Sequence, residues 1–365
     1  MLRAGAETQQ LRGSLVNLLA TQEDAAYAFV HSPYSLVETP LVAFAFEDRL
    51  LWDDLCSVCH GVAVSDEHLF RSLMRSGVAA AVAVTRTKRP RNGQRREKVR
   101  QVVRFLEALP PATVVLHLDA SDTAVLGTPE EILAAFRSMA ADIVLATEFN
   151  LFPDKGDAIR KHMEDRLGGR SGAPFINAGT VIGYAGALLG MYRRMAADDF
   201  SYLRHTTFDT EFSVGRIFDA PFSEQRGVYN YFFNHEKDPV QVAGAAAEAA
   251  ARSGHLEPAH VRLDYDQKLF GTLYKAGETP RVSAEEAKVV CRDEGGGVEC
   301  TNVLTGAHPL VWHGQGKGRY ELAYLLARHG IMLPQHAKGL WYQCAAPGTA
   351  GMPPLPGDDV GPVAV

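Results

Sequence analysis

The chain has 365 residues, of which 46% are apolar and 22% are charged, a composition typical of a globular protein with a substantial buried core. Its formal net charge of −6 argues against a nucleic-acid binder, because such proteins usually carry a basic face. No stretch reaches the roughly 18 to 20 continuous apolar residues of a membrane span. Residues 1–7 also lack the apolar core of a signal peptide, so either the protein is cytoplasmic or its leader is missing.

Continuous apolar runs in the first half of the chain predict strands that are covered on both faces, as in a parallel sheet. These runs are Leu41–Phe46, Val78–Val84, Thr113–Leu118 and Asp142–Ala146. Between the last two runs, Thr128, Pro129 and Glu131 form a helix start of the capping-box type. Strand, helix and strand in this order predict an α/β fold, doubly wound around a mostly parallel sheet.

One stretch, Arg86–Arg100, is strongly basic. It is either a solvated loop that runs into a helix, or a cationic segment that closes on a diphosphate. In the second interpretation Lys98 is a candidate ligand-binding residue.

The strongest local signal is Leu116–Asp122, in which Asp119 and Asp122 follow a buried strand. Ligands of open α/β sheets bind beyond the carboxyl ends of the strands, and Mg²⁺ and Mn²⁺ prefer oxygen ligands. The pair therefore predicts a metal site, unless the two carboxylates only cap the following turn.

Pro174–Tyr184 is a mostly apolar strand that contains Asn177 and several small residues. Glycine inside a strand often marks the close approach of a ligand or of another backbone. Asn177 either holds sugar hydroxyls or is a buried, self-satisfied residue of a β-bulge.

Two acidic segments follow. Phe208–Phe212 contains Asp209 and Glu211 near a helix start, where carboxylates either favour the helix dipole or orient an acceptor hydroxyl. Leu263–Phe270 contains further acidic residues after a short strand, for which a solvated turn is the simpler interpretation.

Leu310–Gly318 is an apolar strand that delivers His313 into a glycine-rich loop. A neutral imidazole can complete a Mn²⁺ site. Gly314 and Gly316 let backbone N–H groups approach phosphate oxygens, and Lys317 adds a positive charge. The loop lacks the spacing of a Walker A motif.

The cysteines leave the compartment open. Cys56 and Cys59 have no partner pair at zinc-site spacing. Cys291 and Cys300 flank a predicted hairpin tip, and a disulfide between them would favour an oxidising compartment such as the secretory lumen.

We expect one catalytic domain over residues 30–343, preceded by an N-terminal extension over residues 1–29. Residues 344–365, rich in proline and glycine, predict a disordered tail.

In combination, these segments resemble the glycosyltransferase domain at the front of the procollagen lysyl hydroxylases. Leu118–Asp122 followed by Gly127–Leu133 is similar to that family's strand-Asp-x-x-Asp and Pro-Glu-Glu helix start. Phe175–Ala185 resembles its asparagine-glycine strand, Leu263–Phe270 its Leu-Asp-His and Ile-Phe segment, and Val311–Gly316 its closing Val-His-Gly-Asn-Gly. The resemblance runs in the same order from about residue 42 to residue 317.

This procollagen glycosyltransferase-like resemblance implies a GT-A fold and transfer of a hexose from a UDP-sugar to a hydroxyl of a protein or glycan, with retention at the anomeric carbon. It implies Mn²⁺ (or Mg²⁺) held by Asp119, Asp122 and His313. The expected donor-binding residues are Asp119, Ser121, Lys98, Gly314, Gly316 and Lys317, and the expected catalytic residues are Asp209, Glu211 and Asn177.

The chain departs from the family pattern at two places. Ser121 replaces an aromatic residue, and Asp209-Thr210-Glu211 stands for Asp-Asp-Gln. These changes motivate an alternative, a catalytically silent module that binds a nucleotide sugar or carbohydrate. A metal-dependent phosphohydrolase ranks third, and a dehydrogenase is disfavoured because no GxGxxG follows the early strands. Nothing resembles the hydroxylase part of those proteins.

Overall fold

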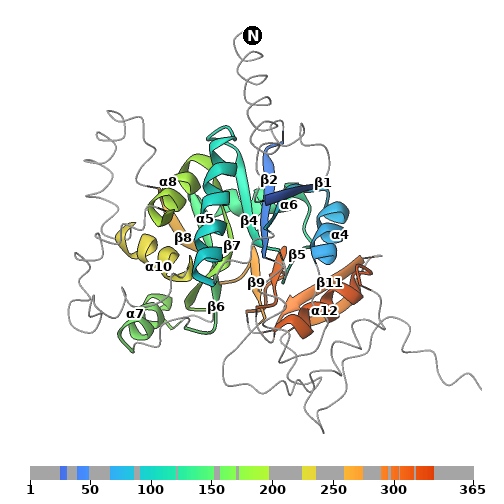
Figure 1. Cartoon of the computed structure of the whole chain (residues 1–365). Helices are drawn as coiled ribbons and strands as arrows, with labels where there is room; N and C mark the ends of the chain where they lie inside the picture. Colours follow the sequence, from blue (N-terminus) through green and yellow to red (C-terminus); the bar gives the residue numbers. More distant parts are fainter. Residues whose placement is uncertain are drawn as a thin grey trace, which may run out of the picture.

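The centre of the computed structural model is a seven-stranded sheet in the order β1-β3-β2-β4-β7-β6-β8 (Figure 1). The strands in that order are Ala25–Val30, Ala79–Thr85, Leu41–Asp48, Val114–Asp119, Phe175–Tyr184, Ile143–Glu148 and Val261–Leu263. The structure describes residues 25–30, 39–48, 66–85, 91–120, 122–151, 157–169, 172–196, 224–235, 259–273, 289–294, 297–303, 305–315 and 318–332.

The sheet is mostly parallel, because only β1 and β7 run antiparallel to their neighbours. The predicted α/β class with a mostly parallel central sheet is therefore confirmed. The predicted apolar runs form β2, β3, β4 and β6. Strand β1 starts at Ala25 and so begins before residue 30, the predicted start of the domain.

Helices cover both faces of the sheet (Figure 1). The helices α5 (Arg91–Glu107), α7 (Asp157–Leu167), α8 (Ala185–Ala196) and α10 (Glu224–His235) pack on one face. The helices α4 (Asp66–Ser76) and α6 (Pro129–Ser138) pack on the other. Successive residues of β2 alternate between the two cores, which is why its sequence is continuously apolar.

Helix α6 begins as the sequence predicts. Thr128 is its N-cap, and the Thr128 hydroxyl accepts a hydrogen bond from the backbone N–H of Glu131. The Glu131 carboxylate accepts the Thr128 backbone N–H in return at 2.7 Å. This capping box fixes where the chain turns after β4 and β5.

A smaller three-stranded sheet lies beside the first, in the order β5-β12-β9. Its strands are Thr123–Val125, Val311–His313 and Phe270–Thr272. Strand β5 follows β4 almost directly in the chain, so this sheet brings the late strand β12 next to the carboxyl end of β4.

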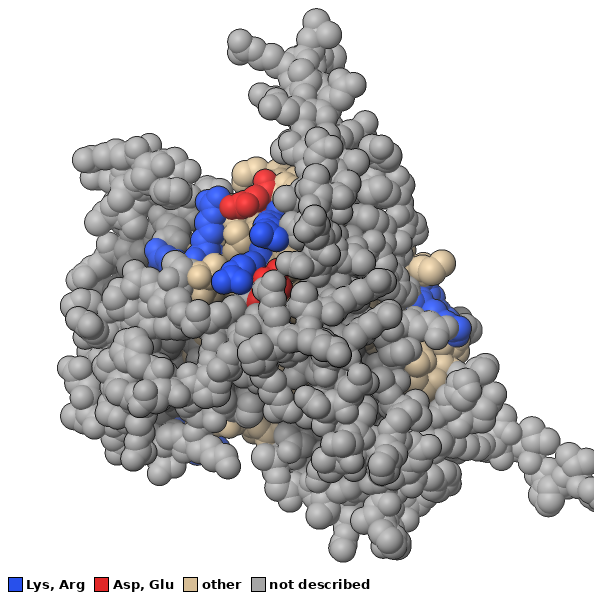
Figure 2. Space-filling model, viewed as in Figure 1, with Lys and Arg blue, Asp and Glu red and all other residues tan. Residues whose placement is uncertain are grey.

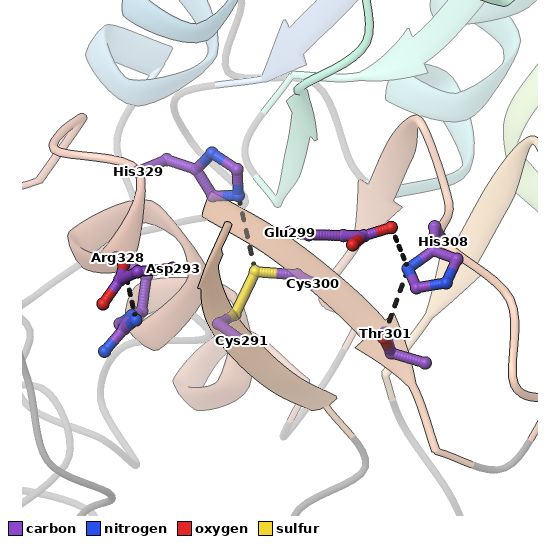
Figure 3. Close-up of a disulfide and its surroundings, with 8 residues drawn as sticks. All are labelled: Cys291, Asp293, Glu299, Cys300, Thr301, His308, Arg328 and His329. Atoms are coloured by element: carbon purple, nitrogen blue, oxygen red, sulfur yellow. Dashed lines mark hydrogen bonds and ion pairs between the residues drawn. A yellow bond between two sulfur atoms is a disulfide. The ribbon is translucent and has the colours of Figure 1, made fainter. Parts of the chain in front are cut away.

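A disulfide between Cys291 and Cys300 crosses the hairpin of β10 (Val289–Glu294) and β11 (Gly297–Asn302), as Figure 3 shows. The two cysteines are directly opposite in the strand register. His329, just after α12 (Arg319–Arg328), lies 3.4 Å from the Cys300 sulfur through its Nε2 atom. The pairing that the sequence left open is thus formed.

The face seen in Figure 2 carries side chains of both signs over α5 and α8. Arg193 of α8 donates to the carboxylate of Glu107 of α5 at 2.8 Å. Among the described helices, none is both long and apolar enough to cross a membrane.

Replacing both Cys291 and Cys300 with serine is expected to lower the free energy of unfolding by roughly 2 to 3 kcal/mol, because the cross-link restricts the unfolded chain. Thermal unfolding of the variant and of the wild type, each with and without reductant, measures this loss. The variant should be insensitive to reductant, and an equal melting temperature for variant and oxidised wild type would contradict the prediction.

Candidate active site

Two carboxylates extend from the end of β4. Asp119 is the last residue of that strand and is half-buried, whereas Asp122 is buried. The Thr123 hydroxyl closes the turn between them by donating to the Asp119 carbonyl at 2.6 Å. The turn therefore directs both carboxylates beyond the carboxyl end of the strand, where the sequence predicts them.

His313 reaches the same place from β12. It pairs with Thr123 across the small sheet, and the Gly314 N–H donates to the Asp122 carbonyl at 2.8 Å. The Nε2 atom of His313 lies 3.2 Å from Asp122 Oδ1 and 4.0 Å from Asp119 Oδ2. One ligand atom from each residue falls within 4.8 Å of the others, a spacing that fits a shared metal ion.

Asn177 determines which nitrogen of His313 faces the carboxylates. Asn177 Oδ1 accepts the Gly179 N–H at 2.9 Å, and Asn177 Nδ2 donates to Glu148 at 3.2 Å, so the amide has one orientation. His313 Nδ1 lies 3.0 Å from that same Oδ1 and therefore carries the proton. Nε2 is left with its lone pair toward Asp119 and Asp122.

The backbone of β7 makes room for this contact. The pairing of β7 with β6 shifts between Leu145 and Ala146, so residues 178–180 form a bulge. A Cβ atom on Gly179 would clash with His313 Cε1 and would lie 2.8 Å from Asp119 Oδ2. The glycine thus permits the close approach of the histidine and a carboxylate, and the bulge forms part of the site.

The electrostatics call for a cation at this point. Burial by itself lowers the pKa of His313, but the carboxylates of Asp122, Asp119 and Glu148 outweigh it and raise that pKa above its usual value. The His313 Nε2 atom is buried and faces the carboxylates of Asp122 and Asp119. A donor set of two carboxylate oxygens and one imidazole nitrogen suits Mn²⁺, so these residues fit a divalent metal.

Lys98 lies beside the carboxylates. It projects from α5, and its ammonium group pairs with Asp119 Oδ1. The lysine side chain is mostly buried, with 11% of its surface exposed. The basic stretch is thus helical from Arg91 onward, and it supplies one cation directly to the site.

Sequence reasoning missed a buried polar cluster behind Asn177. Glu148, the last residue of β6, accepts hydrogen bonds from Asn177 and from Gln225 Nε2 at 3.0 Å, and Gln315 Nε2 lies 3.4 Å from it. Burial raises the pKa of Glu148 to about 7, despite the opposing effects of His313 and these amides. Its place at a strand end was the available signal, since the same rule pointed to Asp119.

Gln225, near the start of α10, ties that helix to β7. Its Oε1 accepts the Ala178 N–H at 2.8 Å, and its Nε2 donates to the Ile176 carbonyl as well as to Glu148. These bonds lie on either side of Asn177. Nothing local in the sequence marks this glutamine.

The remaining predicted residues divide into two groups. Gly314 lies at the site, whereas Ser121, Asp209, Glu211, Gly316 and Lys317 fall outside the described residues. Asp264 is buried, and its carboxylate accepts the backbone N–H groups of Lys268, Leu269 and Phe270 at 2.8 to 3.0 Å. That carboxylate therefore serves the turn between β8 and β9.

Residues 76–203 match the family described as the PLOD GT domain. The match contains Lys98, Asp119, Asp122, Glu148 and Asn177. This chain carries a procollagen glycosyltransferase-like domain, and it is a glycosyltransferase.

Other comparisons add less. A comparison with the curated proteins finds no match. Among solved structures, the chain is similar to a glycosyltransferase involved in the glycosylation of the major capsid of PBCV-1. That likeness has 12% identity and a TM-score of 0.36, and covers 77% of this chain and 95% of the other. At this TM-score it is too loose to support either fold or function.

Gly179→Ala in this PLOD-type domain is expected to weaken Mn²⁺ binding at least about tenfold, because the new methyl group displaces His313 or Asp119. Gly183→Ala is the matched control, since its Cβ would meet Asp142 O at 2.7 Å on the same strand but away from the site. Calorimetric titration with Mn²⁺ compares the two. Equal Mn²⁺ affinities in the two variants would contradict this account of Gly179.

Glu148→Gln is expected to stabilise the metal-free protein at neutral pH. In the folded protein the pKa of Glu148 is about 7, against a usual value of 4.5. The free energy of unfolding therefore falls as the pH rises from about 4.5, because the unfolded chain releases this proton more readily than the folded protein does. The neutral glutamine avoids the loss, which amounts to about 3 kcal/mol at pH 8. Denaturant unfolding between pH 4 and pH 8, in the presence of a chelator, measures it.

The stability curves of wild type and Glu148→Gln should converge below about pH 4.5, where both side chains are neutral. Glu107→Gln is the control, because Glu107 is an exposed glutamate. A gap that stays constant from pH 4 to pH 8 would mean that the pKa of Glu148 is the same in the folded and the unfolded protein, and it would contradict the prediction.

Proposed function

We propose that this glycosyltransferase is metal-dependent and moves a hexose from a UDP-sugar to a hydroxyl group of a protein or glycan, with retention at the anomeric carbon. The observation that carries the proposal is the cluster of Asp119, Asp122 and His313, with the His313 lone pair held toward both carboxylates. The resemblance to procollagen glycosyltransferase domains supplies the donor class and the stereochemistry.

Asp119, Asp122 and His313 would hold Mn²⁺ or Mg²⁺. Such an ion supplies electrostatic stabilisation for the charge that develops on the leaving diphosphate. Asn177 orients the His313 ring, and Glu148 orients Asn177, which keeps the ligand atoms in place before the donor arrives.

Lys98 adds a second positive charge at the same edge of the sheet. Its ammonium group contacts Asp119 Oδ1, so it lies where the phosphates of a metal-bound donor would approach. We propose that Lys98 turns from Asp119 toward the diphosphate when the donor binds. A charge-assisted contact of this kind positions the donor as well as binding it.

The compartment belongs to the proposal as well. The Cys291–Cys300 disulfide favours an oxidising environment, and we propose the lumen of the secretory pathway.

The first test is thermal stabilisation by nucleotides and nucleotide sugars, each with and without Mn²⁺. A rise in melting temperature that needs both a uridine diphosphate compound and Mn²⁺ supports the proposal, and the strongest sugar identifies the donor. Stabilisation by UDP and Mn²⁺ without slow hydrolysis of any UDP-sugar would instead favour a silent binding module. A response to no nucleotide would overturn the proposed donor.

Asp119→Asn should then reduce turnover at least about a hundredfold, because a neutral amide replaces a charged metal ligand. Asp165→Asn on α7 is the control, since Asp165 is exposed and pairs only with Lys161 among the contacts described. Donor hydrolysis and circular dichroism are measured on both variants. Wild-type turnover in Asp119→Asn would remove Asp119 from the metal site.

A further inference from the structure

Gln267 is held in an uncommon conformation at a fully buried position. Its φ is +55°, in the left-handed region that non-glycine residues rarely adopt, and none of its surface is exposed. Its backbone N–H donates to the Asp264 carbonyl at 3.0 Å, which closes the turn between β8 and β9. The surroundings must compensate for this backbone strain, and the side-chain contacts indicate how.

The Gln267 amide joins three other elements. Its Nε2 donates to the Thr147 carbonyl at 2.9 Å and to the Thr272 hydroxyl at 2.6 Å. Its Oε1 accepts from Asn302 Nδ2 at the end of β11. Both N–H groups of the amide are thus used, in a place where water could not replace them.

The partners of Gln267 lie next to residues of the site. The Thr147 carbonyl belongs to the peptide group that leads into Glu148. Thr272 stands opposite His313 in the parallel pairing of β9 with β12, and the Leu273 N–H donates to the His313 carbonyl at 3.1 Å. The Thr272 hydroxyl also donates to the Thr147 carbonyl at 2.8 Å.

These bonds connect the two sheets. Glu148 and Asn177 belong to the seven-stranded sheet, whereas His313 belongs to the small one. The contact of His313 with Asn177 therefore depends on the spacing between the sheets. Where the end of β6 meets β9, the described hydrogen bonds that fix this spacing are made by the side chains of Gln267 and Thr272.

We infer that Gln267, with Thr272, is a positioning residue for the active site. The two side chains set the distance between the strand end that carries Glu148 and the strand that carries His313. They thereby keep His313 Nδ1 on Asn177 and Nε2 toward the carboxylates. This inference rests on the proposed metal-dependent function, and it assigns to the network an effect on metal binding beyond its contribution to folding.

The test uses the full chain with three substitutions. Thr272→Val keeps the shape and removes the hydroxyl, Thr272→Ser keeps the hydroxyl, and Gln267→Met keeps the length and removes the hydrogen bonds. Each is titrated with Mn²⁺ alone, and each is melted with chelator and with Mn²⁺. We expect Thr272→Val and Gln267→Met to bind Mn²⁺ about 3- to 10-fold more weakly, and Thr272→Ser to stay within about twofold of wild type.

The melting temperatures separate positioning from stability. A purely structural role would lower them equally with chelator and with Mn²⁺, whereas positioning also shrinks the increment that Mn²⁺ adds. Wild-type Mn²⁺ affinity in Thr272→Val overturns the inference, whatever its melting temperature and even if Gln267→Met fails to fold. No Mn²⁺ response in the wild type itself would instead overturn the metal site, and the positioning role with it.

Discussion

An imidazole lone pair and two carboxylates point at one another within the site, and that arrangement needs a cation between them. Asn177 determines which nitrogen of His313 carries the proton. Its oxygen accepts the Gly179 N–H and therefore also accepts the proton of His313 Nδ1. With the proton on the far side of the ring, the near side attracts either a second proton or a metal ion. Two carboxylate oxygens and a nitrogen that lie within 4.8 Å of one another make a divalent metal the better match.

The smaller sheet is needed because it brings His313 to the carboxyl end of β4. A mostly parallel sheet directs its strand ends to one edge, which accounts for Asp119 and Glu148, whereas His313 comes from the smaller sheet. Strand β12 reaches the same edge by pairing with β5, which begins directly after Asp122. Its parallel pairing with β9 fixes the position of His313 along the strand direction. The lack of a side chain at Gly179 then lets β7 approach His313 of β12.

The sequence predicted those features that depend on local pattern. Apolar runs marked β2, β3, β4 and β6, and the capping box marked the start of α6. Asp119 and Asp122 followed from a strand end, and His313 from a strand that enters glycines. Gln225 and Gln267 were not predictable, because their role comes from partners far away in the chain. Glutamine is common on surfaces, and only the fold shows that these two are buried.

The disulfide affects the site indirectly, because it fixes the register of β10 and β11. Asn302 and Cys300 are two residues apart on β11, so both face the interior while Thr301 faces the other side. A slip of one residue between β10 and β11 would turn Asn302 away from Gln267. The Cys291–Cys300 bond prevents that slip, since it joins the two residues that stand opposite each other. The disulfide thus helps to keep Asn302 paired with the buried Gln267 amide. That amide contacts Thr147 on β6, next to Glu148, and Thr272 on β9, the strand that pairs with the His313 strand.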